Sequence, residues 1–301
     1  MNAMHLSRRE FLAGSLATAA AAACTAAPAA EATETSRNPL CAFTKFLQPL
    51  SYEQLAETIA RLGFDGIEAT VRAKGQVLPE RAADDLPRLV EALRKHGLEI
   101  TIMTTTVTRA DVAADEQLLR LAASLGVKRY RMGYYTYDLE RPVKPQLDAL
   151  RPVVRELAAM NREIGIQGLY QNHAGARYVG ATVWDLQSLI DEIPVAELGF
   201  AFDIRHAVAE AGLSWPVLQN VAAAHVGAVC VKDFQWEDEK PRNVPLGQGR
   251  VKQTALRRWK SAAFAGPYSL HIEYLEQAGV EPNIEALGQD LATLRQWLAA
   301  V

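Results

Sequence analysis

The sequence predicts an α/β protein built as a single (β/α)₈ barrel, and three observations lead to that fold class. From residue 39 onward, short apolar runs alternate with longer amphipathic stretches in eight successive pairs. Strands that alternate with helices imply parallel strands joined by right-handed crossovers. The first run is followed by FTKFLQPLS, without the GxGxxG turn that an open nucleotide-binding sheet places there. Eight such units, with no linker between them, fit one closed barrel.

The predicted strands are the apolar runs, in order along the chain. We place them at 40–45, 65–71, 98–104, 128–133, 166–171, 197–203, 226–232 and 268–273. Between them lie stretches with apolar residues at helical spacing. We place these helices at 51–62, 79–96, 111–125, 144–164, 182–192, 214–224, 252–263 and 283–299.

Local punctuation supports the helix boundaries. Ser51 stands three residues before Gln54, which is the spacing of a capping box, and Gly63 follows as a stop signal for the same helix. Pro79 and Pro216 fit the first turn of their helices, where a missing N–H costs nothing.

The first 30 residues predict a targeting segment that is separate from the fold. Residues 7–12 (SRREFL) form a twin-arginine motif, followed by an apolar, Ala-rich stretch without acidic residues. This layout is typical of a signal peptide for the twin-arginine route. We therefore expect a cleaved signal peptide at 1–30, a flexible lead-in at 31–38, a barrel at 39–301 and a periplasmic location. Lipidation at Cys24 is the alternative, although the usual Leu three residues earlier is missing.

Composition narrows the class of partner. The 301-residue chain is 49% hydrophobic and 22% charged, with a net charge of −3 and no Lys/Arg-rich run. These values are ordinary for a globular protein and predict no nucleic-acid partner. Beyond the signal segment, no apolar stretch is long enough to span a membrane. Cys41 and Cys230 fall in predicted strands, so we expect buried thiols rather than a disulfide.

Polar residues gather where the predicted strands end, which is where barrels of this kind carry their chemistry. Side chains alternate between the two faces of a strand. In the sixth strand the bulky Phe200 and Phe202 suit the helix side, so Asp203 points into the barrel mouth. The same alternation places seven more polar side chains at the mouth: Glu68, Arg131, Gln171, His173, Lys232, His271 and Glu273. His206 follows shortly after Asp203 and is added to this set.

This convergence predicts a functional pocket, because a buried charge costs several kcal/mol unless it is paired or binds a metal. Carboxylates, imidazoles and an amide suit Mg²⁺, Mn²⁺, Fe²⁺ or Zn²⁺. Lys232 and Arg131 add positive charge that can orient hydroxyl or carbonyl oxygens. Neither a GxSxG turn nor a CxxC pair is present. Aromatic residues near the mouth either stack on a sugar ring or pack the loops: Tyr134, Tyr135, Trp184, Trp215 and Trp236.

Six short motifs carry a family resemblance. They are GFDGIEATV (63–71), YQNH (170–173), FDIRH (202–206), VKDF (231–234), LGQG (246–249) and HIEY (271–274). In this order they resemble the xylose isomerase-like TIM barrels, grouped as sugar phosphate isomerases and epimerases, over residues 39–300. FTKFL, VLPE and YQNHAG are similar to an exported subgroup of that family.

The resemblance implies one divalent metal (Mn, Mg, Fe, Co or Zn), held by Glu, Asp, His and Glu at four strand ends. The matching positions here are Gln171, Asp203, Cys230 and Glu273, so two of the four depart from the family pattern. We expect Gln171, Asp203 and Glu273 as ligands, with Gln171 offering a neutral oxygen. Cys230 is either a thiolate ligand or a plain core thiol.

The resemblance also implies proton abstraction next to a carbonyl, with the metal stabilising the enediolate. Glu273 is the expected base on one face of the sugar. Gln171 cannot take a proton, so His173 or His206 would serve on the other face. The candidate substrate-binding residues are Lys45, Glu68, Arg72, Arg131, Lys232 and His271.

The leading hypothesis is a carbohydrate isomerase or epimerase for a small sugar or keto-sugar. One alternative is a lyase that eliminates from a keto-glycoside. Another is a sugar-binding protein without turnover on a degenerate barrel, motivated by the two changed ligand positions. A nuclease for abasic DNA shares the fold family but is disfavoured by the acidic charge balance.

Overall fold

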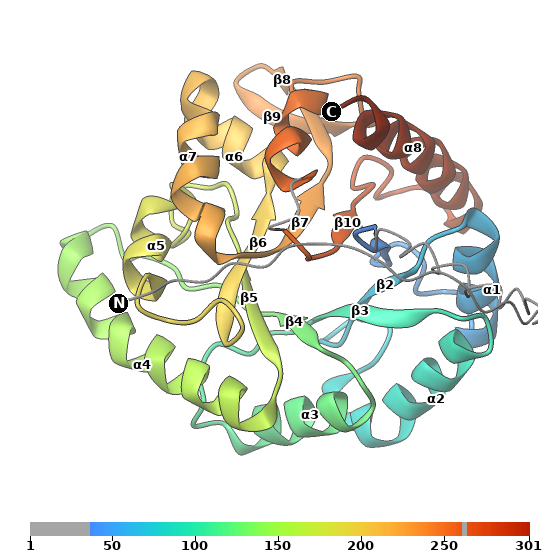
Figure 1. The fold of residues 1–301 in the computed structure, drawn as a ribbon, viewed down its shortest axis with the longest axis horizontal. Helices are drawn as coiled ribbons and strands as arrows, with labels where there is room; N and C mark the ends of the chain where they lie inside the picture. Colours follow the sequence, from blue (N-terminus) through green and yellow to red (C-terminus); the bar gives the residue numbers. More distant parts are fainter. Residues whose placement is uncertain (1–36, 261–263) are drawn as a thin grey trace, which may run out of the picture. The chain divides into compact units, whose positions relative to one another are not determined.

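The computed structural model describes residues 37–260 and 264–301, and its parallel strands form a closed barrel (Figure 1). The order around the barrel is β1-β10-β7-β6-β5-β4-β3-β2, as predicted for a (β/α)₈ fold. The barrel strands are β1 (Leu40–Phe43), β2 (Gly66–Thr70), β3 (Glu99–Thr104), β4 (Arg129–Arg131), β5 (Gln167–Gln171), β6 (Leu198–Asp203), β7 (Val226–Val231) and β10 (Tyr268–Leu270). The predicted signal segment lies outside the described residues.

Helices surround the barrel on its outer side (Figure 1). They are α1 (Tyr52–Leu62), α2 (Ala82–Arg94), α3 (Ala113–Ser124), α4 (Val143–Ile164), α5 (Trp184–Ile190), α6 (Ile204–Ala211), α7 (Trp215–Ala222) and α8 (Val280–Ala300). The predicted capping box is confirmed, because Ser51 and Gln54 bond each other's backbone N–H. Gly63 ends α1 at φ +86°, a left-handed conformation that glycine adopts without strain.

Two sequence predictions of local structure are wrong. Residues 253–260 form a 3₁₀ helix (η4) rather than an α-helix. Over so short a segment, the spacing of apolar residues does not distinguish the two kinds of helix. The last barrel strand ends at Leu270, so Glu273 lies in a loop. Two further elements were not predicted: α6, which is only eight residues long, and the hairpin of β8 (Asp233–Glu237) and β9 (Lys240–Val244), whose strands are short and largely polar.

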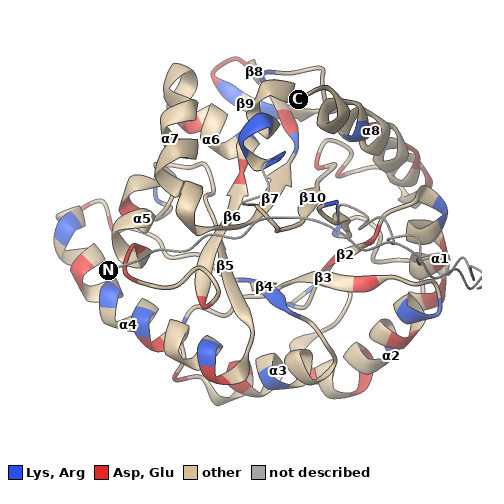
Figure 2. Ribbon diagram, viewed as in Figure 1, with Lys and Arg blue, Asp and Glu red and all other residues tan. Residues whose placement is uncertain are grey.

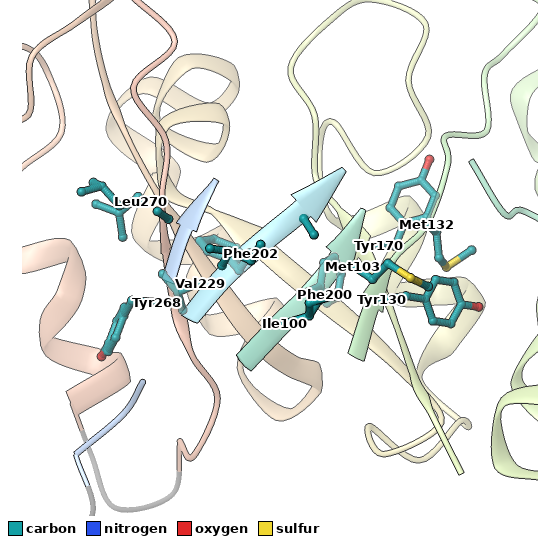
Figure 3. Close-up of a cluster of buried hydrophobic side chains, with 14 of the residues drawn as sticks. Ile100, Met103, Tyr130, Met132, Tyr170, Phe200, Phe202, Val229, Tyr268 and Leu270 are labelled. Carbon is teal, nitrogen blue, oxygen red and sulfur yellow. The ribbon is translucent and has the colours of Figure 1, made fainter. Parts of the chain in front are cut away.

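Two apolar layers confirm the predicted parity of the strands. The barrel interior holds a small cluster of Cys41, Ile102, Leu169, Ala201, Ala228 and Cys230. The alternate side chains belong to the large layer between the strands and the helices (Figure 3), where Phe200 and Phe202 lie with Val229 and Leu270. Both cysteines are buried and free, as predicted. The inward parity therefore continues to the strand ends and brings polar side chains to the mouth.

The outer helices carry charges of both signs, interspersed along their exposed faces (Figure 2). Within residues 37–260 and 264–301, none of the helices combines the length and hydropathy needed to cross a bilayer.

Candidate functional site

Lys232 connects two carboxylates at the mouth of the barrel. Its Nζ lies 2.6 Å from Oε2 of Glu273 and 3.3 Å from Oδ2 of Asp203. Asp203 ends β6, Lys232 directly follows β7, and Glu273 lies in the loop after β10. Lys232 is only 4% exposed, so its charge is satisfied by these two partners. Burial alone would lower the pKa of Lys232, but Asp203 and Glu273 raise it and keep the ammonium charged.

Asp203 is held from several sides, which fixes its carboxylate. Its Oδ1 accepts the backbone N–H of His206 at 3.0 Å and so caps α6. Its Oδ2 accepts from Nε2 of Gln171 at 2.7 Å. Asn172 fixes the backbone of Asp203 by accepting from its N–H at 2.7 Å and donating to its carbonyl at 3.1 Å. The polar pair Gln171-Asn172 thus positions the strand end of β6.

The amide of Gln171 has both ends occupied. Its Oε1 accepts from Arg131 and from the hydroxyl of Tyr134, while its Nε2 donates to Asp203. Arg131 and Tyr134 can only donate to this oxygen, which fixes which way the amide points. The oxygen expected to face a metal therefore faces two donors instead.

His173 and His206 face each other with ring centroids 4.1 Å apart. Nδ1 of His173 lies 2.9 Å from the carbonyl oxygen of Ala174, which can only accept, so Nδ1 carries the proton and Nε2 a lone pair. Nδ1 of His206 lies 3.0 Å from the Arg205 guanidinium, which can only donate, so in His206 the proton is on Nε2. The two rings therefore offer opposite groups, one acceptor and one donor.

Both imidazoles are neutral near pH 7. Burial, with the charge of Lys232, lowers the pKa of His173 and holds that of His206 well below its usual value. The Nε2–H of His206 is buried, 3.6 Å from Oδ2 of Asp203, and has no hydrogen-bond partner among the residues that the structure describes. A buried donor without a partner is uncommon in folded proteins and marks this position as a candidate for a ligand contact.

Glu68 and His271 lie deeper, in the barrel interior. Glu68 is fully buried and accepts from Thr104 at 2.6 Å, from Ser269, and from Nε2 of His271 at 3.0 Å, besides its ion pair with Arg131 at 2.8 Å. Burial alone would raise the pKa of Glu68, but Arg131 and His271 hold it well below its usual value. Glu68 in turn raises the pKa of His271 against the effect of burial. Their predicted substrate contact stays a prediction, and this geometry favours a supporting role.

Lys45 and Arg72 lie at the rim. Nζ of Lys45 is 3.0 Å from Glu276 and 3.5 Å from Glu273. A pocket of about 610 Å³ is lined by Lys45, Phe46, Gln48, Arg72, Ala73, Lys74, Thr106, Glu276 and Gln277. A second pocket of about 500 Å³ is lined by Pro241, Arg242, Asn243, Glu273, Tyr274, Leu275, Glu276, Gln277 and Ala278. The two pockets share Glu276 and Gln277, and each is large enough for a small ligand.

The residues present do not fit a divalent metal as they are arranged. An ammonium lies between the two carboxylates expected to bind it, and Gln171 turns its oxygen to other donors. Glu68, Cys230 and His271 form another group whose ligand atoms lie within 4.8 Å of one another. There, Glu68 is bonded on both oxygens, and burial raises the pKa of the Cys230 thiol. Neither group presents a set of free ligands.

Several features were missed by the sequence analysis. Tyr134 was expected only as an aromatic surface, Asn172 was given no role, and Arg205 was not singled out. Asn172 and Arg205 fall inside the motifs YQNH and FDIRH, so their place in these motifs could have indicated a role at the site. The bond from Tyr134 to Gln171 crosses between strands and has no signature in local spacing.

The family model for xylose isomerase-like TIM barrels matches residues 56–300. The chain belongs to this family. A search of curated protein sequences finds no match.

Solved structures share the fold at low identity. The IolI protein with a bound zinc atom is 17% identical with a TM-score of 0.69, over 86% of this chain and 99% of that one. The 3-keto-D-glucoside 4-epimerase YcjR from E. coli is 16% identical with a TM-score of 0.66, over 86% of this chain and 100% of that one. A Mycobacterium smegmatis protein of the family in complex with magnesium is 17% identical with a TM-score of 0.62, over 87% and 97%. Structural neighbours of this barrel thus include a sugar epimerase and zinc- and magnesium-bound proteins.

Proposed function

We propose that the protein is a carbohydrate isomerase or epimerase that removes a proton next to the carbonyl of a small sugar or keto-sugar. The observation that carries the proposal is the Nε2 lone pair of His173, a neutral acceptor in a mouth that also holds the ammonium of Lys232. Proton abstraction of this kind needs a base and nearby positive charge for the oxygen that becomes negative. The family membership and the sugar epimerase among the neighbours support the substrate class.

In the proposed step, the C–H bond next to the carbonyl breaks and its proton moves to Nε2 of His173. The electron pair forms a carbon–carbon double bond, and the carbonyl pair moves onto oxygen to give an enediolate. Isomerisation is completed when His173 returns the proton to the former carbonyl carbon and the proton of the neighbouring hydroxyl moves to the former carbonyl oxygen. In epimerisation, His173 releases its proton to solvent and water delivers a proton to the opposite face of the same carbon. Burial alone would raise the pKa of Glu273, but Lys232 at 2.6 Å and His271 hold it well below the usual value, which weakens Glu273 as the first base.

Solvent exchange tests the base. In D₂O, NMR should show deuterium entering the carbon next to the carbonyl of a reacting keto-sugar. His173→Gln should slow this exchange by about 100-fold or more, the usual contribution of a general base. Glu273→Gln should slow it less, and His96→Gln, at an exposed helix end, should leave it unchanged. Loss of exchange in Glu273→Gln with full activity in His173→Gln would return the role of base to Glu273.

The same experiment separates the alternatives. Exchange followed by release of an alcohol or a second sugar identifies a lyase for keto-glycosides, for which the Nε2–H of His206 is a donor to the leaving oxygen. Saturable sugar binding without exchange or product identifies a binding protein. Metal assistance also stays a prediction, and no step above uses it.

We also propose a periplasmic location, supported by the twin-arginine motif at residues 7–12. Replacement of Arg8 and Arg9 by Lys should retain the protein in the cytoplasmic fraction of its host, and continued export of the double variant would contradict the route.

A further inference from the structure

We propose that Lys232 is a built-in cation that takes the place of a divalent metal between Asp203 and Glu273, so that the mouth stabilises the enediolate without a metal ion. The catalytic half of this inference rests on the proposed function; the exclusion of metal from the mouth does not.

The position of the ammonium is the first support. Nζ of Lys232 is within 3.3 Å of one oxygen of each carboxylate, and the side chain is almost fully buried. A divalent ion bound by Asp203 and Glu273 would lie within a few ångströms of this charge. At such distances like charges repel strongly even at the effective dielectric of a protein.

The orientation of the other expected ligand is the second support. Arg131 and Tyr134 donate to Oε1 of Gln171, and Gln171 donates to Asp203 through Nε2. A metal would meet the N–H end of this amide. Rotating the amide would place its N–H₂ against the Arg131 guanidinium, which can only donate, and its oxygen against the carboxylate of Asp203, which is unfavourable on both sides.

Charge balance is the third support. The buried carboxylates of the mouth and interior are Glu68, Asp203 and Glu273. The cations that pair with them are Arg131, Lys232, the charged His271 and, at the rim, Lys45, which also pairs with Glu276. The two imidazoles beside Lys232 are neutral, so they add no charge to this balance. A divalent ion would leave an excess of positive charge in a buried site, which is costly.

The chemistry follows from what an ammonium can do. Lys232 has three N–H donors, of which one bonds Glu273, while Asp203 forms an ion pair with the same ammonium at 3.3 Å. A remaining donor can bind the carbonyl oxygen and strengthen that bond as the oxygen becomes negative. No covalent bond to Lys232 forms, and the proton from carbon moves to His173.

Mn²⁺ binding, followed by the electron paramagnetic resonance of free Mn²⁺, tests the exclusion of metal. The wild type and Lys232→Arg should show no Mn²⁺ site in the mouth. Lys232→Ala should bind one Mn²⁺ ion, about 100-fold tighter than wild type, because the like charge is gone. Asp203→Asn in that background should abolish the new site. Lys144→Ala, on the exposed face of α4, is the matched control and should behave as wild type.

Two results would overturn the exclusion. One is a wild-type Mn²⁺ site that Asp203→Asn removes. The other is a folded Lys232→Ala variant, with wild-type circular dichroism, that gains no site. If Lys232→Ala does not fold, Lys232→Met keeps most of the buried side-chain volume without the charge. The same Mn²⁺ titration of that variant then tests the exclusion.

Solvent exchange tests the catalytic half. Wild type treated with EDTA should retain its exchange rate, while Lys232→Met should lose about 100-fold, the usual cost of removing one donor to a developing oxyanion. Lys232→Arg should recover part of the rate. Loss of exchange in EDTA that Mn²⁺ restores would overturn this half. If no sugar exchanges in any variant, the proposed function fails, and the Mn²⁺ titrations still decide whether Lys232 excludes metal.

Discussion

At the scale of single residues, the neighbours of each histidine decide what it can do. His173 and His206 lie side by side, yet a carbonyl makes one an acceptor and a guanidinium makes the other a donor. Strand parity in the sequence predicted that His173 and Lys232 face the mouth. It could not predict the tautomers, because they depend on Ala174 and Arg205 in the folded loops. For the same reason it could not show that Tyr134 and Arg131 occupy the oxygen of Gln171.

The pH dependence of exchange belongs to this scale. Burial and Lys232 lower the pKa of His173, so the base should stay unprotonated at neutral pH, and the rate should fall only as the pH drops through that lowered pKa, below about 6.5. Removal of the neighbouring charge in Lys232→Met should move this acidic limb to higher pH. A profile of kcat/KM against pH for both proteins checks this, and a limb that does not move would show that His173 is not the titrating base.

At the scale of elements, short pieces at the mouth position the chemistry. The β8–β9 hairpin and the loop after it are held by Asp233, whose carboxylate accepts the backbone N–H groups of Phe234, Gly247, Gly249 and Val251 at 2.8 to 3.0 Å. The motifs VKDF and LGQG are therefore two halves of one structural unit. The sequence showed both motifs, but their pairing joins strand and loop across a hairpin that spacing did not reveal.

Asp290 on α8 provides a second anchor for that loop and makes its stability depend on pH. Its carboxyl accepts the N–H of Leu246 at 3.1 Å, and burial raises its pKa to about 6. The contribution of Asp290 to the free energy of unfolding is therefore fully present below its unfolded pKa of about 3.9, and it is lost as the pH rises through the folded pKa of about 6. Asp290→Asn, which cannot ionise, should gain stability relative to wild type between pH 4 and pH 7.

Urea unfolding of wild type and Asp290→Asn at several pH values measures this difference. Asp148→Asn, in an exposed pair with Lys144, is the matched control and should show no such gain. A constant difference between wild type and Asp290→Asn across this range would refute a raised pKa.

At the scale of the whole molecule, the fold could be predicted almost completely, because eight repeats of one pattern admit few topologies. The errors fall where the pattern is interrupted: at η4, α6, the hairpin and the end of β10. The interior charges were predicted to point inward, but their partners were not. Glu68 on β2 joins Thr104 of β3, Arg131 of β4 and His271 after β10, four segments far apart in sequence.

This network should contribute to the stability of the whole barrel. Glu68→Gln keeps the shape but leaves Arg131 and His271 without a buried counter-charge, so the free energy of unfolding should fall by about 3–5 kcal/mol. Glu163→Gln, which loses only an exposed pair with Arg120, should cost less than about 1 kcal/mol. Denaturant titration of both variants measures the difference, and equal effects would mean that the buried network adds nothing.

Asp203 links the outer helices to the barrel mouth. One of its oxygens closes the first turn of α6, and the other holds Lys232 and Gln171. The outer layer and the mouth are thus mechanically coupled through a single side chain. A displacement of α6 would therefore move the carboxylate that holds the ammonium, and a change in the mouth that moves Asp203 would loosen the first turn of α6.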